Sequence, residues 1–262
     1  MPSWSEIITD VNLYSNAGTE LDKKREMYLT QIHSITGRNV IAYYSGWLKT
    51  PDAPHVSIDE QDKNAFMTTV YKLDKAKGLD LILHTPGGDI AATESIVTYL
   101  KSLFNGDVRA FIPQISMSAG TMIAMSCREI IMGEQSSLGP IDPQMGGIAC
   151  QAVIDEFKRA VSEVSANQAS LGLWQTIISK YHPTFLTACE NAVAWSAQLA
   201  EQWLKEVNPQ IDFDKIKNVF LNHNKSYSHS RHLSKQDCKN VGLNIVDLET
   251  NPDLQDAILS LH

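Results

Sequence analysis

Four apolar, β-branched segments alternate with helix-like segments in the first half of the chain, and this alternation constrains the fold more than any other feature. The strand-like segments are residues 39–47, 79–84, 108–115 and 129–132. Between them lie segments with periodic apolar positions, at residues 57–77, 91–103 and 121–127. Such repeats predict an α/β fold with a mostly parallel sheet flanked by helices, in which chemistry collects at the carboxyl ends of the strands.

Signals at the ends of the elements refine this prediction. Ser57 and Glu60 have the spacing of a capping box, so we expect a helix to begin there. Residues 1–37 mix charged and apolar positions at helical spacing and indicate an N-terminal helical arm. The C-terminal half is predominantly helical, with segments at 149–165, 171–179, 183–206 and 213–221, a short helix capped by Ser234 and a closing strand at 243–248.

Charge and cysteine pattern limit the possible classes of function. The 262-residue chain carries a formal net charge of −8 without a basic cluster, so we expect no nucleic-acid partner. Its four cysteines lie far apart, without the spacing of zinc or redox sites, and predict reduced structural thiols, no metal and no cofactor. No signal-peptide pattern and no run of about 18 apolar residues occurs, so a soluble, cytoplasmic protein is expected.

The stretch Gln114–Ala124 concentrates the candidate chemistry. A strand that stops at small residues and turns directly into a helix presents a hydroxyl at the bend, beside unpaired N–H groups, and Ser118 holds that place. Gly87 and Gly88 end the neighbouring strand and leave backbone amides uncovered. The plain alternative is that Ser116 and Ser118 only cap the helix.

Three motifs in this order resemble a known family. They are His84-Thr-Pro-Gly-Gly-Asp, Ser116-Met-Ser-Ala-Gly-Thr and Ser137-Leu-Gly-Pro-Ile-Asp-Pro-Gln. Together they resemble the Clp/crotonase-fold serine peptidases, and most of all the serine dehydrogenase proteinase family, relatives of signal peptide peptidase A. The resemblance implies a Clp/crotonase-like spiral fold over residues 39–248, between the arm at 1–38 and a C-terminal tail at 249–262. It also implies hydrolysis of peptide or protein substrates through a serine, and assembly into homo-oligomers.

The same resemblance assigns roles to individual residues. Ser118 is the nucleophile of a serine endopeptidase, the turn at Gly87 and Gly88 supplies one oxyanion-hole amide, and Ala119 supplies the other. An acyl-transfer oxyanion needs such donors about 2.7–3.1 Å away. Backbone amides at a glycine turn and at a helix start meet that requirement.

The general base remains open at this stage. No histidine occurs between His84 and His182, so the histidine that the Clp branch carries after its serine is missing. Relatives of signal peptide peptidase A use a lysine, which must be buried to lose its charge, and Lys180 is preferred here over Lys158. His229 or His232 is the alternative base. Two aspartates, Asp89 and Asp142, can orient a base or serve only as turn and cap residues.

Two other functions stay in competition. A crotonase-type enzyme would use the same oxyanion hole on an acyl-coenzyme A thioester, although the acidic chain offers no basic patch for the phosphates. A catalytically inactive scaffold or binding module would keep the fold for assembly, and the unassigned base favours it. Any ATPase or membrane-protein partner is not determined by the sequence.

Overall fold

The computed structural model describes residues 17–262, and the predicted arm is described from Ala17 only; residues 1–16 lie outside the described part. The chain divides into two compact units. The first comprises the chain through Leu138 together with Leu233–His262, and the second comprises Gly139–His232. Within the described residues, no helix has both the length and the apolar character needed to cross a membrane.

The first unit is built on a parallel five-stranded sheet in the described part of the chain. Its strands, in the order β1-β2-β3-β5-β10, are β1 (Asn39–Tyr44), β2 (Leu79–His84), β3 (Val108–Ile112), β5 (Glu129–Met132) and β10 (Ile245–Asp247). This confirms the predicted α/β fold with a parallel sheet. β2 is buried at all six positions, which matches its nearly continuous apolar sequence.

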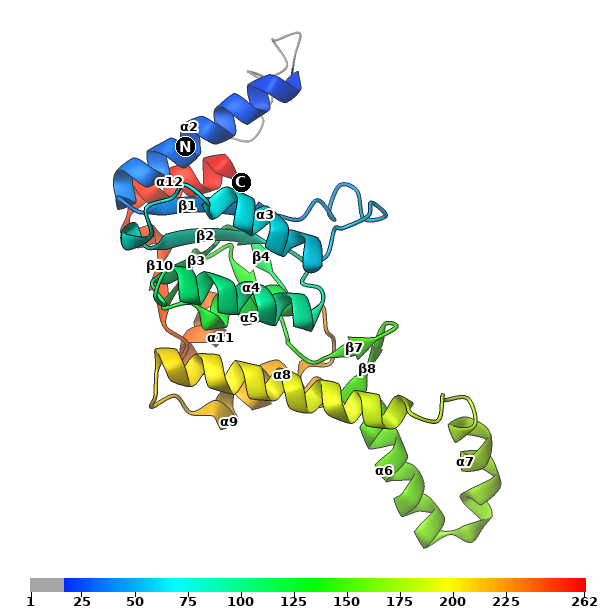
Figure 1. Cartoon of the computed structure of the whole chain (residues 1–262). Helices are drawn as coiled ribbons and strands as arrows, with labels where there is room; N and C mark the ends of the chain where they lie inside the picture. Colours follow the sequence, from blue (N-terminus) through cyan, green and yellow to red (C-terminus); the bar gives the residue numbers. More distant parts are fainter. Residues whose placement is uncertain (1–16) are drawn as a thin grey trace. The chain divides into compact units, whose positions relative to one another are not determined.

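Helices cover both faces of this sheet (Figure 1). One face packs against α2 (Ala17–Thr36) and α12 (Pro252–Leu261) through a core that includes Ile32, Ile82 and Ile258. The opposite side carries α3 (Glu60–Val70), α4 (Ile90–Leu103) and α5 (Ala119–Ser126). The remaining helical elements of this unit are α11 (Lys235–Asn240) and the 3₁₀ turns Lys75–Lys77 and Leu248–Thr250.

Several sequence expectations about element ends are wrong, among them the first strand, which ends at Tyr44 and not at Trp47. The third strand stops at Ile112, because Pro113 interrupts the ladder, and the chain resumes in β4 (Ile115–Ser116) of a second small sheet. That sheet also contains β6 (Ser137–Leu138) and β9 (Leu233–Ser234). The helix after the first strand is capped by Asp59 with Asp62, not by Ser57 with Glu60, because Asp59 is the last extended residue before the helix.

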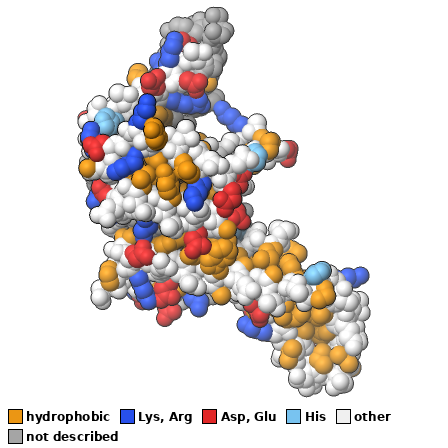
Figure 2. Space-filling view, viewed as in Figure 1, with side chains coloured by type: hydrophobic (Ala, Val, Ile, Leu, Met, Phe, Trp, Pro, Cys, Tyr) orange, Lys and Arg blue, Asp and Glu red, His pale blue; other side chains and the backbone are white. Residues whose placement is uncertain are grey.

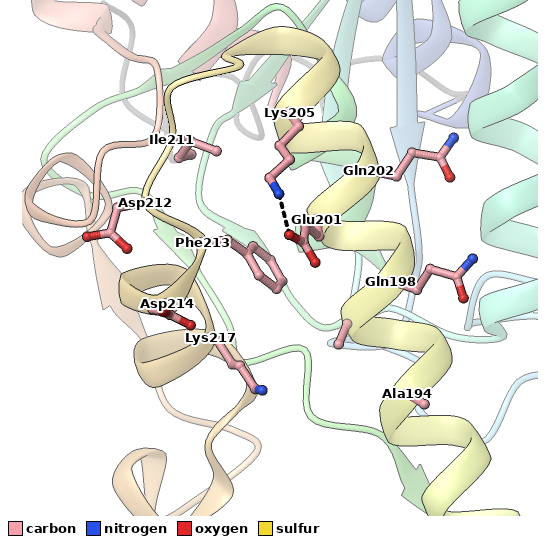
Figure 3. Close-up of a pocket in the computed structure, with 11 residues that line it drawn as sticks. Ala194, Gln198, Glu201, Gln202, Lys205, Ile211, Asp212, Phe213, Asp214 and Lys217 are labelled. Carbon is pink, nitrogen blue, oxygen red and sulfur yellow. Dashed lines mark hydrogen bonds and ion pairs between the residues drawn. The ribbon is translucent and has the colours of Figure 1, made fainter.

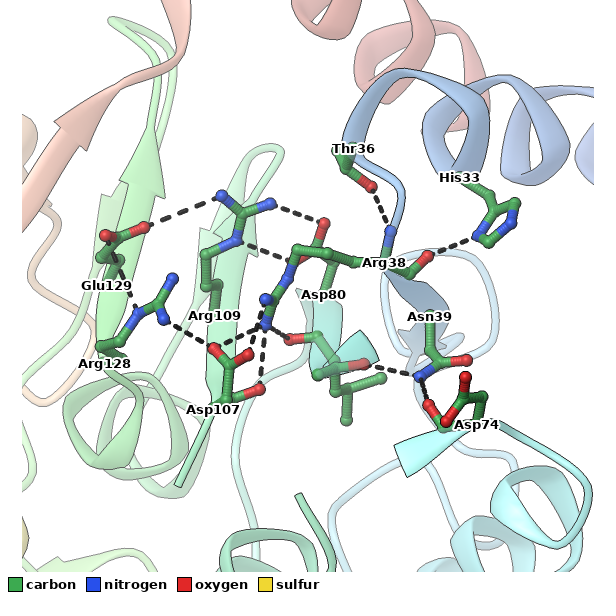
Figure 4. Close-up of polar contacts among 12 residues, drawn as sticks. His33, Thr36, Arg38, Asn39, Asp74, Asp80, Asp107, Arg109, Arg128 and Glu129 are labelled. Atoms are coloured by element: carbon green, nitrogen blue, oxygen red, sulfur yellow. Dashed lines mark hydrogen bonds and ion pairs between the residues drawn. The ribbon is translucent and has the colours of Figure 1, made fainter. Parts of the chain in front are cut away.

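An ion-pair network ties the amino ends of the strands together (Figure 4). Asp80 is completely buried and accepts hydrogen bonds from Arg38 Nε at 2.7 Å and from Arg109 Nε and Nη2 at 2.8 Å each. Arg38 also donates to both carboxylate oxygens of Asp107, at 2.8 and 2.9 Å. These hydrogen bonds keep the pKa of the Asp107 carboxyl below its ordinary value. The network lies at the end of the sheet opposite to the candidate site.

The second unit is helical apart from one short hairpin. Its elements are β7 (Gln144–Met145), β8 (Ile148–Ala149), α6 (Cys150–Ala166), the 3₁₀ turn Gln168–Ser170, α7 (Leu171–Ile178), α8 (Phe185–Val207), α9 (Phe213–Ile216), a π-helix (Lys217–Leu221) and α10 (His223–Ser226). α6 and α8 pack together around Cys150, Val153, Ile154 and Cys189. All four cysteines are buried and free, and burial raises the pKa of the Cys150 thiol to about 12.

Candidate active site

Ser118 occupies a strained bend between a strand and a helix. β4 ends at Ser116, α5 begins at Ala119, and Ser118 between them has φ 50° and ψ −118°. A residue with a β-carbon adopts such a positive φ only where the surrounding structure enforces it, and such strain is common at active sites. The Ser118 side chain makes no capping hydrogen bond, although the residue stands at the N-cap position. The hydroxyl is therefore not occupied with capping the helix.

Ser116, the other serine of the motif, has a different environment. It is completely buried, and its Oγ has no hydrogen-bond partner in the described part of the chain. A β-carbon added at Gly120 would lie 2.6 Å from that oxygen, so the helix backbone passes directly over it. Ser118, in contrast, is partly exposed. Only the Ser118 hydroxyl is accessible to a substrate.

The glycine turn after β2 packs directly against this bend. Thr85 bridges to the Ser118 segment through hydrogen bonds from its N–H to the Ile115 carbonyl, at 3.2 Å, and from the Met117 N–H to its own carbonyl, at 3.0 Å. Gly87 follows with φ 97°, and a β-carbon there would lie 2.7 Å from the Met117 carbonyl oxygen. Glycine is required at this position both for its dihedral angle and for the close approach.

The backbone amides of this turn differ in their availability. The Gly87 N–H donates to Thr85 Oγ1 at 3.2 Å. Within residues 17–262, neither the Gly88 N–H nor the Ala119 N–H has a hydrogen-bond acceptor. Gly88 lies against the backbone of Ile58, which would be 2.3 Å from an added β-carbon, so this amide is held firmly. Of the three predicted oxyanion-hole residues, Gly88 and Ala119 therefore have backbone amides available to a substrate.

In the second unit, a buried carboxylate holds two histidines. The Asp142 side chain is 2% exposed, and its two oxygens accept hydrogen bonds from His223 Nδ1 at 2.8 Å and from His229 Nδ1 at 2.9 Å. Because each imidazole donates through Nδ1, its Nε2 carries a lone pair that can accept a proton. His223 was missed in the sequence, although it lies in the same polar segment as His229.

The loop that carries Asp142 is fixed by hydrogen bonds on both sides of the aspartate. Ile141 donates its N–H to the Phe220 carbonyl at 2.7 Å and accepts from Ser196 Oγ at 3.0 Å. The Pro143 carbonyl accepts from the Cys150 N–H at 2.9 Å. These contacts hold the carboxylate in one place, which favours a role in orienting an imidazole.

The other predicted bases have more exposed positions. Lys180 follows α7 and is exposed, so the second unit does not give it the burial that a lysine base requires. Lys158 lies on the exposed side of α6, as expected for a solvated lysine. His232 is exposed as well. Lys180 therefore stays a prediction without support from its surroundings.

Two residues near the glycine turn have structural roles. Asp89 caps α4 by accepting the Ala92 N–H at 2.8 Å. His84 is packed between Tyr44 and Trp47 and contacts Gln114 through Nε2 at 3.2 Å, and its burial lowers its pKa. Among the described residues, no cluster of three or more metal-ligating side chains could hold an ion.

A further histidine and carboxylate pair lies on the loop before α3. His55 Nδ1 is 2.5 Å from Asp59 Oδ2, and Ile58 of the same loop bridges to Gly88. His55 is 53% exposed, and Asp59 is already used as the cap of α3. The four-residue spacing of His55 and Asp59 is the signal in the sequence that points to this pair.

Ser118 lies at a strained strand-to-helix bend beside the amides of Gly88 and Ala119, which have no acceptor among residues 17–262, and this arrangement is typical of serine hydrolases with a parallel α/β fold. Residues 18–180 match the ClpP-like SDH-type serine proteinases, and the chain belongs to that family. It is also similar to two uncharacterized proteins of Methanocaldococcus jannaschii. It is 35% identical to MJ0137 over 42% of this chain and 36% of that protein, and 32% identical to MJ1495 over 54% and 49%. The chain thus spans half or less of these relatives.

Proposed function

We propose that this protein is a serine peptidase that cleaves peptide bonds through an acyl-enzyme on Ser118. The observation that carries the proposal is the positive φ of Ser118, at a bend that leaves the amides of Gly88 and Ala119 without acceptors. Two fixed backbone donors next to a hydroxyl suit acyl transfer, because they stabilise the negative charge that develops on the carbonyl oxygen. Family membership supports the same class of reaction.

His229 is the general base in this proposal, and Asp142 orients it. A carboxylate that is 2% exposed fixes the His229 tautomer so that Nε2 accepts a proton. The Asp59 side chain beside His55 is 33% exposed and already caps a helix, so it is the weaker orienting group. Lys180 is exposed.

The proposed reaction has two stages, acylation of Ser118 and hydrolysis of the resulting ester. Ser118 Oγ attacks the peptide carbonyl carbon, its proton passes to His229 Nε2, and the oxyanion is bound by the amides of Gly88 and Ala119. The intermediate collapses as the C–N bond breaks and the imidazolium protonates the leaving amine. Water then attacks the ester with the same histidine as base, which releases the acid and restores the serine.

Labelling and hydrolysis test the nucleophile. Wild type should be labelled on Ser118 by a fluorophosphonate and should degrade an unfolded protein such as casein, whereas Ser118→Ala should do neither. Equal casein degradation by wild type and Ser118→Ala would refute the proposal.

The base is tested by three matched alanine variants. His229→Ala should lower kcat/KM on the order of 10³-fold, the usual range for a lost general base. His55→Ala, which removes the more exposed histidine of the other pair, and Lys180→Ala should retain activity. Loss of activity in Lys180→Ala, with activity retained in His229→Ala, would reassign the base to the lysine.

The predicted homo-oligomer is a second part of the proposal, and exposed apolar side chains on α6 and α7 support it. Val161 on α6 is 70% exposed and lines a shallow hollow of about 600 Å³ together with Trp174 and Ile178. Leu173 on α7 is 62% exposed. Figure 2 shows hydrophobic side chains gathered over the pair of helices α6 and α7. Such surface is unusual on a monomer and typical of an interface.

The test is the mass in solution by light scattering. Val161→Asp with Leu173→Asp should lower the assembly state, whereas Lys72→Asp, in the exposed turn after α3, should leave it unchanged. An unchanged mass in the double variant would contradict this interface.

A further inference from the structure

The long helix α8 borders a groove in the second unit, which we call the α8 groove. It consists of two adjoining hollows of about 740 and 560 Å³ between α8 and residues 211–224. The hollows share three lining residues, Ala197, Asp214 and Lys217, and therefore adjoin each other along α8. Figure 3 shows the larger hollow, with α8 on one side and the segment from Ile211 to Lys217 on the other.

The length of the groove suits an extended chain. Along α8 it runs from Val193 to Lys205, which corresponds to about 18 Å at 1.5 Å per residue. An extended polypeptide rises about 3.3 Å per residue, so about five residues fit. Ala194 and Ala197 contribute only methyl groups on the α8 side, which lets a bound backbone approach the helix closely.

Amide side chains border the groove at several points. Gln198 and Gln202 on α8 border the larger hollow and point away from the segment Ile211–Lys217 (Figure 3), and Asn218, Asn222 and Asn224 line the smaller hollow. The side chains of Gln198 and Asn222 make no hydrogen bond within the part of the chain that the structure describes. An amide group both donates and accepts, as the peptide backbone does, so these side chains can pair with a polypeptide of varied sequence.

The charge of the groove selects among polypeptides. Its lining contains two lysines, Lys205 and Lys217, and the four carboxylates Asp155, Glu201, Asp212 and Asp214. Lys205 pairs with Glu201 at 2.5 Å, and Asp212 pairs with Lys215 of its own segment at 3.6 Å, which leaves Asp155 and Asp214 against Lys217. Asp214, where the hollows join, has no ion-pair partner among residues 17–262. The excess of carboxylates favours a ligand with a basic side chain and disfavours nucleic acids.

The wall of the groove leads to the predicted base. The π-helix Lys217–Leu221 forms part of it, and π-turns occur frequently at functional sites. The chain passes directly from this turn through Asn222 to His223, which shares the Asp142 carboxylate with His229. A ligand in the groove would lie next to the segment that holds the catalytic imidazole.

We propose that the α8 groove binds an extended polypeptide segment that carries a basic side chain, and that it recruits substrate to the peptidase. The inference rests on the proposed function for its purpose, but the binding itself does not require catalysis. Binding is therefore measured with the full-length Ser118→Ala protein, by the fluorescence anisotropy of two labelled heptapeptides. One peptide contains alanine, leucine and lysine, and the other has glutamate in place of each lysine.

The lysine peptide should bind about tenfold more tightly than the glutamate peptide. Asp214→Lys should weaken its binding by about the same factor. Glu190→Lys, on an exposed position of α8 outside the groove, changes the net charge equally and should have no effect. Ala197→Trp should block binding without any change in charge, and an unchanged Tm in each variant shows that it is folded.

The results distinguish failure of the proposed groove binding from failure of the proposed peptidase activity. Equal weakening by Asp214→Lys and Glu190→Lys, or full binding by Ala197→Trp, would overturn the groove. In the catalytically intact background, Ala197→Trp should raise KM for casein several-fold and leave kcat unchanged. Peptide binding that depends on Ala197 and Asp214, without cleavage by the wild type, would support the groove and refute the peptidase.

Discussion

Replacing Asp80 by asparagine should destabilise the first unit, because the substitution leaves a buried cation without its partner. Arg38 keeps the Asp107 carboxylate, with both oxygens within 2.9 Å. Among residues 17–262, the carboxylate that remains near Arg109 is that of Glu129, at 3.8 Å, and the Arg109 side chain is 20% exposed. Removing one partner of a buried pair costs about 3–5 kcal/mol. The contact with Glu129 and the remaining amide oxygen place the expected loss near the lower end.

A loss of about 3 kcal/mol corresponds to a fall in Tm of about 6–12 °C for a unit of this size. Calorimetry on the full chain measures it, with Asp107→Asn as the control, since that carboxylate is 33% exposed and should contribute about 1 kcal/mol or less. A second substitution, Arg109→Met, should recover part of the Tm lost in Asp80→Asn by removing the stranded charge. A fall in Tm no larger than that of Asp107→Asn, or no recovery in the double variant, would refute the reasoning.

Three further outcomes are expected. Gly87→Ala should lower both Tm and peptidase activity, because its β-carbon would lie 2.7 Å from the Met117 carbonyl oxygen at a positive φ; calorimetry and casein hydrolysis check this. Burial and the neighbouring His84 lower the pKa of His262 to about 4, so the unfolded chain binds more protons between about pH 6.5 and 4. Stability should therefore fall as the pH drops through this window, and a Tm series should show a shallower fall in His262→Gln. Asp142→Asn should reduce kcat for casein hydrolysis by at least 10²-fold with little change in KM, and an unchanged kcat would argue against an orienting carboxylate.

The central sheet was predictable because its strands are apolar and its connections helical. β2 and β5 have the predicted bounds, and Ser234 caps a short helix as expected. Strand ends were less predictable where a single residue decides them, as at Pro113. The choice of Asp59 over Ser57 as a cap depends on where the extended backbone stops, and the residue types alone do not reveal it.

The candidate site divides along the same lines. The serine bend and the glycine turn are encoded in short local stretches, so Ser118, Gly87 and Gly88 could be selected from the sequence. Asp142 pairs with His223, 81 residues further along the chain, and with His229, 87 residues further. No local sequence pattern predicts these contacts. The tertiary fold alone brings the three side chains together.

The positive φ of Ser118 also has a consequence for stability. Glycine would relax at φ 50°, so Ser118→Gly should melt at a higher temperature than Ser118→Ala. The residue that presents its partly exposed hydroxyl at the bend is therefore also a locally unstable one.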